Sequence, residues 1–282
     1  MEHRQTWTEE IKSQDGLLSV NLREIWHYRD LLLMLLKRDF ITFYKQTILG
    51  PLWFFIQPVL TTAIYIFLFG QVAKIDIGDV PQIPFYLAGI TVWNYFSDTL
   101  NKTATVFRDN ASVFGKVYFP RLIMPLSIVF SGLLKFAIQF GLFLAVVLYY
   151  TFVKELLHPN IWMLMTPVLI LLMAAFSLGL GMIFSSLTTK YKDLTFLLAF
   201  GIQLFMYASP VIYPVALIPE MYRPIAAANP LTGIFECFRY AYLGTGTFDP
   251  QSLVISSAII VMLLFAGIII FNKAEKSFMD TV

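Results

Sequence analysis

The amino-acid sequence predicts an all-α integral membrane protein with six transmembrane helices. Of its 282 residues, 58% are hydrophobic and only 13% are charged, whereas a soluble domain of this size needs far more charge to cover its surface. The apolar residues also occur in long runs. A helix of about 20 residues pairs its own backbone groups while it crosses a hydrocarbon core of about 30 Å, so these runs are best explained as membrane spans.

The N-terminal segment, residues 1–24, is predicted to be a cytoplasmic tail. It is polar, carries charges of both signs and lacks the apolar run of a cleavable signal peptide.

Residues 25–50 are predicted to form an amphipathic helix at the cytoplasmic interface of the membrane. Apolar side chains recur there at helical spacing, and polar ones fall on the opposite side, which suits a helix lying flat on lipid headgroups. A cytoplasmic helix packed on its own core is the alternative. The apolar side holds Leu32, Leu36, Phe40 and Phe43, with Tyr44 beside them, and the opposite side holds Arg38, Thr42, Lys45 and Gln46.

Residues 51–272 are predicted to form the transmembrane domain. Asn94, Asp98 and Asn101 interrupt the second span, and the third is longer than a simple crossing requires, which implies tilt or extension beyond the lipid. The six predicted spans are 52–72, 85–105, 122–150, 161–187, 194–213 and 252–271.

The distribution of lysine and arginine predicts that both chain ends are cytoplasmic. Fourteen of these residues lie in the N-terminal residues 1–50, in the loops near 106–121 and 189–193 and in the C-terminal tail 273–282, and four lie in the opposite set of connections. Positive charge is concentrated on the cytoplasmic side of membrane proteins. An even number of spans requires the same result.

The cytoplasmic loop 108–121 gives the strongest functional signal. A short helix beginning near Asp109 would present Val113, Phe114 and Val117 as an apolar knob between basic ends, and Pro120 would end it. Such a knob suits docking into a groove on a soluble partner. The alternative is a simple surface connector.

The outer segment 208–246 is punctuated by prolines and contains two short apolar pieces, 211–218 and 231–243. Neither is long enough to cross the membrane, so we expect re-entrant or interfacial helices rather than an ordinary loop. Glu236 and Arg239 are one helical turn apart. We expect a local ion pair that makes partial burial tolerable, and a role in gating is the alternative.

Two further features of the spans concern polar and small residues. Lys135 lies within the third span, where an ammonium costs a few kcal/mol. We expect it to line a polar path for an anionic substrate, or else to snorkel to an interface or pair with Asp98. Small residues at four-residue spacing on the fourth span indicate close helix packing; they are Ser177, Gly181 and Ser185, with Gly179 nearby.

The sequence argues against an enzyme. It contains no phosphate-binding loop with the Gly-x-x-x-x-Gly-Lys-Ser/Thr pattern, so the chain is not expected to bind ATP or another cofactor. Its three histidines are far apart, which predicts no metal site.

Five segments, in order along the whole chain, carry a family resemblance. They are Lys37-Arg-Asp-Phe40 and its continuation to Tyr44, Leu49-Gly-Pro-Leu-Trp53, Lys116-Val-Tyr-Phe-Pro-Arg121, Ser209-Pro-Val-Ile-Tyr-Pro214 and Asn229-Pro-Leu-Thr232. Together they resemble the membrane subunits of polysaccharide ABC exporters, which are type-2 ABC permeases. That family exports lipid-linked O-antigen, capsule or teichoic acid.

This resemblance implies partners and a location. Two copies of the chain would pair with two copies of a separate ATPase that binds ATP and magnesium. The substrate would be a lipid-linked polysaccharide rather than a nucleic acid, and the location would be the bacterial inner membrane.

The resemblance also implies roles for individual residues. The ATPase-coupling helix would contain Asp109, Asn110, Ser112, Val113, Phe114, Lys116, Val117 and Tyr118, and the interface helix Arg38, Phe40, Phe43, Tyr44 and Lys45. Channel-lining candidates are Tyr65, Tyr95, Phe96, Lys135, Phe205 and Tyr207. The outer gate would contain Pro210, Tyr213, Pro214, Asn229, Pro230, Glu236 and Arg239.

The sequence leaves three alternative functions. The nearest is a type-2 ABC permease for drugs or other lipids. An ion-coupled secondary transporter needs carboxylates at membrane depth, and Asp98 is the only candidate in the six predicted spans. A membrane enzyme is the third.

Overall fold

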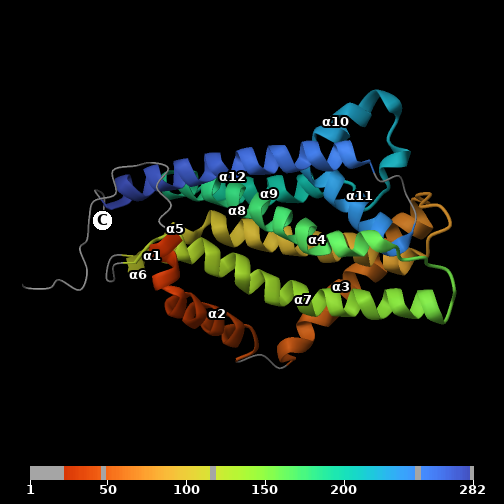
Figure 1. Ribbon diagram of the computed structural model, residues 1–282, viewed down its shortest axis with the longest axis horizontal. Coiled ribbons are helices and arrows are strands. Elements are labelled where there is room, and N and C mark those ends of the chain that lie inside the picture. The colour runs from red at the N-terminus through yellow and green to blue at the C-terminus, as the bar shows by residue number, and fades with distance from the viewer. Residues whose placement is uncertain (1–21, 46–48, 115–118, 245–248, 280–282) are drawn as a thin grey trace, which may run out of the picture.

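In a computed structural model, residues 22–45, 49–114, 119–244 and 249–279 are described. Long helices run side by side along the longest axis of the molecule, and short helices lie at both ends (Figure 1). The described residues contain no strand. The prediction of an all-α protein is therefore confirmed.

Four helical segments of the described chain are long and apolar enough to cross a membrane. They correspond to the first, third, fourth and sixth predicted spans. The first, Gly50–Val72, combines η1 (Gly50–Leu52), α3 (Trp53–Tyr65) and the π-helical η2 (Ile66–Val72). The third predicted span is α7 (Ile123–Phe152), and the fourth is η3 (Ile161–Met165) followed by α8 (Thr166–Lys190). The sixth is the part of α12 (Pro250–Met279) that ends at Ala274.

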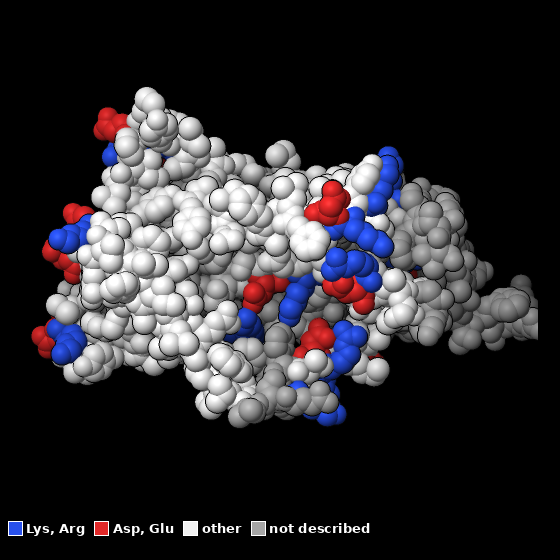
Figure 2. Space-filling view, turned by 180° about the vertical axis from the view of Figure 1, so that it is seen from behind, with Lys and Arg blue, Asp and Glu red and all other residues white. Residues whose placement is uncertain are grey.

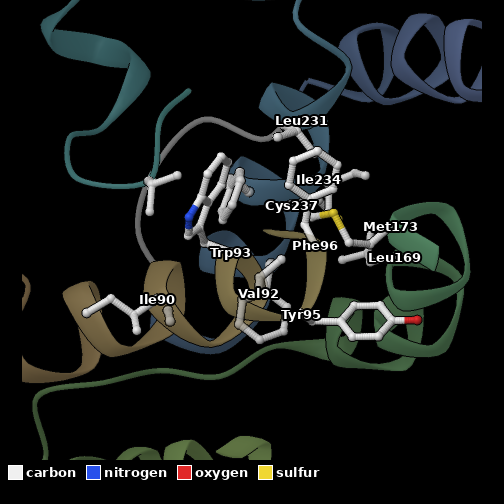
Figure 3. Packing of buried hydrophobic residues seen from close by; sticks show 14 of the residues in the cluster. Ile90, Val92, Trp93, Tyr95, Phe96, Leu169, Met173, Leu231, Ile234 and Cys237 are labelled. Carbon is white, nitrogen blue, oxygen red and sulfur yellow. The ribbon is translucent and has the colours of Figure 1, made fainter. Parts of the chain in front are cut away.

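The second predicted span is α4 (Gln82–Ala104), which is the central helix of the bundle. Tyr86 and Phe96 are fully buried, and side chains of α4, α8 and the short helix α11 (Pro230–Leu243) meet in the core (Figure 3). A helix surrounded by protein does not need a uniformly apolar surface, which explains why α4 tolerates the polar residues noted above.

The fifth predicted span is shorter than expected. The helix α9 (Leu194–Tyr207) has 14 residues, or about 21 Å at 1.5 Å per residue, and residues 208–213 are not helical. Pro210 follows shortly after its last turn, and a proline cannot continue the hydrogen-bond ladder of a helix. The predicted bounds 194–213 were therefore wrong at their outer end.

Small residues on α8 allow its neighbours to approach closely. A Cβ atom added to Gly181 would lie 2.5 Å from Cβ of Thr103 on α4, and one added to Gly267 on α12 would lie 2.4 Å from the carbonyl oxygen of Gly179. Ser177 and Ser185 are fully buried. The packing role predicted for this stripe is confirmed.

Short helices gather at the two ends of the bundle (Figure 1). One end holds α1 (Leu22–His27), α2 (Arg29–Tyr44), α5 (Val106–Asp109) and α6 (Ala111–Phe114). The other end holds η4 (Val215–Leu217), η5 (Glu220–Tyr222), α10 (Arg223–Ala228) and α11.

The second apolar piece, 231–243, is helical as predicted and forms α11, which is almost wholly buried. The first piece, 211–218, is irregular apart from η4, so the prediction of a helix there was wrong. At the chain end, α12 continues to Met279 through most of the predicted tail 273–282.

Candidate functional site

An ion pair joins α4 and α7 beside α2. The Lys135 ammonium donates to the Asp98 carboxylate, and the two side chains are 15% and 40% exposed. One turn before Lys135, Ser131 Oγ donates to Asp39 Oδ2 of α2 at 3.3 Å, and Arg38 Nη2 lies 2.8 Å from Asp39 Oδ1. The pairing of Lys135 with Asp98, which was one of the predicted possibilities, is therefore present.

At the end of the bundle that holds α10 and α11, the guanidinium of Arg239 on α11 binds the backbone that follows α9. Arg239 is 4% exposed. Nη1 donates to the carbonyl oxygen of Tyr213 at 3.1 Å, Nη2 donates to that of Val211 at 2.5 Å, and the guanidinium carbon lies 4.1 Å from the ring centre of Phe85. Arg239 thus satisfies two carbonyl groups that have left the helix, as non-helical backbone buried among apolar helices requires.

Glu236 completes this arrangement. Its Oε1 lies 3.8 Å from Arg239 Nη1 and accepts from the backbone N–H of Val215 at 3.4 Å. Burial raises the pKa of the Glu236 carboxyl, while Arg239 and the Val215 N–H oppose that shift. Burial also lowers the pKa of Arg239 to about 10, with Glu236 opposing it, so the guanidinium stays charged at neutral pH. The predicted ion pair is confirmed.

Asn229 ties the end of α9 to the start of α11. Its side-chain oxygen accepts from the Leu231 N–H at 3.0 Å, capping α11, and its Nδ2 donates to Ser209 Oγ at 2.9 Å and to the Ala208 carbonyl at 3.2 Å. Tyr213 Oη donates to the Tyr207 carbonyl at 3.0 Å.

The remaining predicted gate residues lie close to the contacts made by Arg239 and Asn229. Pro210 is buried, and Pro230 is the first residue of α11. Pro214, Glu236 and Arg239 line a cavity of about 320 Å³. The structure thus brings the predicted gate residues together at one end of the bundle.

The aromatic channel candidates divide into two groups. Tyr95 is 3% exposed and packs against Phe136, Phe96 is fully buried and stacks on Phe176, and Phe205 packs against Phe96. These side chains belong to the core of a single chain, so the expectation that Tyr95 and Phe96 line a channel was wrong for this conformation. Because lipid-facing and protein-facing positions are both apolar, sequence alone does not separate them.

Tyr65 and Tyr207 keep contact with the surface. Tyr65 Oη donates to Met206 Sδ at 3.3 Å, and Tyr207 is 49% exposed. Both lie where α3 and α9 approach each other, so they remain candidates.

The predicted coupling loop contains α5 and α6, which are separated at Asn110. Phe114 is 6% exposed, because its ring packs against Phe107 and Phe119. The expectation that it forms part of an exposed knob was therefore wrong. Val113 is half-buried, Asp109 and Ser112 are exposed, and Lys116, Val117 and Tyr118 lie outside the described residues.

The predicted interface helix begins earlier than expected and has a break at Tyr28 between α1 and α2. Leu35 is buried against neighbouring helices, Phe40 is half-buried, and Arg38 and Lys45 are exposed. The side chains of Phe43 and Tyr44 lie outside the described part, as do residues 46–48.

Gly89 on α4 was not predicted as a site residue, but it allows the backbone at Val211 to lie directly against α4. A Cβ atom there would lie 2.4 Å from the carbonyl oxygen of Val211 and 3.3 Å from Arg239 Nη2. A glycine inside a predicted span was the available signal.

Long apolar helices with exposed apolar sides, around buried polar contacts, define a multi-pass membrane protein. Residues 30–243 match the family model of the ABC-2 type transporters, and the chain belongs to this family. Members of the family are permease subunits without a catalytic domain, and they pair with an ABC ATPase subunit.

The chain is similar along nearly its full length to permeases named for O-antigen export and polysialic acid transport. It is 28% identical over 264 residues to the O-antigen export system permease protein RfbA of Myxococcus xanthus, covering 93% of this chain and 98% of the relative. It is 29% identical over 252 residues to the protein of the same name in Klebsiella pneumoniae, covering 89% of this chain and 94% of the relative. Identity to the polysialic acid transport protein KpsM of Escherichia coli is 22% over 247 residues, or 86% and 93%.

Proposed function

We propose that this chain is the membrane subunit of an ABC exporter that moves a lipid-linked polysaccharide, such as O-antigen, capsule or teichoic acid, across the bacterial inner membrane. The observation that carries the proposal is the near full-length similarity to O-antigen export and polysialic acid transport permeases.

In the proposed topology the chain crosses the membrane six times, with α4 and α9 as the second and fifth spans. The end that holds α1, α2, α5 and α6 faces the cytoplasm together with both chain ends, and α10 and α11 face outward. The bias of lysine and arginine toward the first of these ends supports this orientation.

The proposed assembly contains two copies of this chain and two ATPase subunits, which bind ATP and magnesium. One bundle is too small to enclose a glycan, so the path lies between two copies, beside α3 and α9. The exposed apolar side chains of these helices support this, with Leu60 at 55% and Phe200 at 58% exposure. Closure of the ATPase pair then acts through α5 and α6 on the packed helices.

Deletion of the gene in its own bacterium tests the proposed substrate. We expect surface polysaccharide to disappear and lipid-linked glycan to accumulate inside, with unchanged susceptibility to drugs. Normal surface polysaccharide with increased drug susceptibility would instead favour the alternative of a drug or lipid permease. The chain is also 23% identical over 224 residues to the inner membrane transport permease YadH of Escherichia coli K12, whose name states no substrate.

Replacement of an exposed residue in α6 tests the ATPase contact. Ser112→Trp adds bulk at the proposed docking surface without entering the core, so it should strongly reduce co-purification of the ATPase while membrane insertion persists. Met221→Trp, at a position 74% exposed at the opposite end, is the matched control and should leave co-purification intact. Equal ATPase recovery from both variants would refute the docking surface.

A further inference from the structure

A groove between α3 and α7 opens on the side of the molecule that exposes apolar residues. Its volume is about 480 Å³, and its lining includes Trp53, Gln57, Leu60, Thr61 and Lys135. Trp53 is 48% and Leu60 55% exposed, so the groove is accessible from the surrounding lipid. Lys135 carries a charge, and the other described lining residues are neutral.

Basic and acidic side chains of α2 and α4 lie around Lys135. The carboxylates are Asp39 and Asp98, which pair with Arg38 and Lys135. The charge of Lys102 on α4 also interacts with those of Asp98, Lys135 and Asp39. Figure 2 shows basic and acidic side chains together in a hollow between the charged groups at the two ends.

The position of this cluster along the bundle matches the inner leaflet. Lys135 lies 12 residues after Ile123, where α7 begins, or about 18 Å along the helix. Ser131, one turn earlier, bonds to Asp39 of α2, which is the proposed cytoplasmic interface helix. The ammonium therefore lies in the cytoplasmic half of α7, whose 30 residues span about 45 Å, and Leu60 and Ile64 continue the groove outward along α3.

We propose that this groove binds the phosphate end of a polyprenyl-linked lipid before export, which rests on the function proposed above. Lys135 supplies the charged donor, the Gln57 side-chain amide supplies a neutral donor, and one hydrocarbon chain lies along Leu60 and Ile64. The Thr61 hydroxyl donates to the Gln57 backbone carbonyl at 2.9 Å. A single groove between two helices suits a lipid with one chain per phosphate. Asp98 neutralises Lys135 when no lipid is bound. When the lipid binds, its phosphate competes with Asp98 for the ammonium.

This competition predicts effects of opposite sign, which a merely structural ion pair would not give. The full chain is reconstituted in phosphatidylethanolamine nanodiscs, and bound undecaprenyl phosphate is measured by native mass spectrometry. Asp98→Asn removes the competing carboxylate and should increase binding. The double variant Lys135→Gln/Asp98→Asn keeps a neutral hydrogen-bonding pair and should reduce binding about tenfold, as expected for one charge-assisted contact of about 1.5 kcal/mol.

Two controls complete the experiment. Lys154→Gln removes an exposed lysine near the other end of α7 and should leave binding unchanged. Phosphatidylglycerol at tenfold excess should not displace undecaprenyl phosphate. Wild-type binding by the double variant, equal changes in both Asp98 variants, or displacement by phosphatidylglycerol would each overturn the site. Failure of the proposed function appears separately, as normal polysaccharide export after gene deletion.

Discussion

At the scale of single residues, the most consequential side chain is Arg239. It lies where the chain leaves α9, in contact with two backbone carbonyls, the Phe85 ring and Glu236. A buried guanidinium is costly unless acceptors surround it, and an irregular backbone segment is costly unless donors reach it. Each therefore compensates for the other.

Arg239→Met should destabilise the protein by about 3–5 kcal/mol, because it leaves the Glu236 charge and two carbonyl groups without their partner. Thermal unfolding of the purified chain in detergent would show this as a large fall in melting temperature. The matched control is Arg223→Met. The Arg223 pair with Glu220 is exposed, with 3.7 Å between Nη1 and Oε1, and should be worth only about 0–1 kcal/mol. Similar falls for both variants would contradict the role of Arg239.

At the scale of elements, the contact between α8 and α12 depends on the absence of side chains. Lipid tails are as apolar as leucine, so helices in a bilayer gain little from burial alone and associate through close van der Waals packing. Gly179 and Gly267 provide that approach, and Ser186 Oγ adds a hydrogen bond to the Ile270 carbonyl at 3.4 Å.

Gly267→Ala should separate α8 from α12 and cost about 1–3 kcal/mol through overpacking. Gly141→Ala on α7 is the control, because a Cβ atom there meets nothing within 4 Å and alanine is the better helix former. We expect a lower melting temperature for the first variant and an unchanged or slightly higher one for the second. An unchanged melting temperature for Gly267→Ala would show that the contact between α8 and α12 does not limit stability.

At the scale of the whole molecule, the short helices at the two ends differ in how far their residues are exposed. One end carries α5 and α6 with exposed polar residues, and the other carries the buried α11. Since the proposed ATPase works in the cytoplasm, the coupling model requires Ser112 and Met221 to lie on opposite sides of the membrane.

Cysteine labelling of intact cells tests this orientation. The single native cysteine, Cys237, is buried, so background labelling should be low. A membrane-impermeant maleimide should modify Met221→Cys in intact cells and Ser112→Cys only in inverted vesicles. Modification of Ser112→Cys from outside would reverse the proposed topology and remove the basis for ATPase docking.

Sequence was sufficient for properties that depend on residues close together in the chain. Run length and helical spacing alone predict the all-α class, the Glu236–Arg239 ion pair and the packing role of the small residues around Gly181. The family was also recognisable from short segments spread along the chain.

Only the tertiary structure decided which sides of the helices face protein. It placed Phe96 and Phe114 in the core rather than at a channel or docking surface, and it brought Arg239 to the carbonyls of Val211 and Tyr213. The physical reason is that lipid and protein interior are both apolar. A hydrophobic pattern therefore shows that a helix avoids water, but not which neighbour it meets.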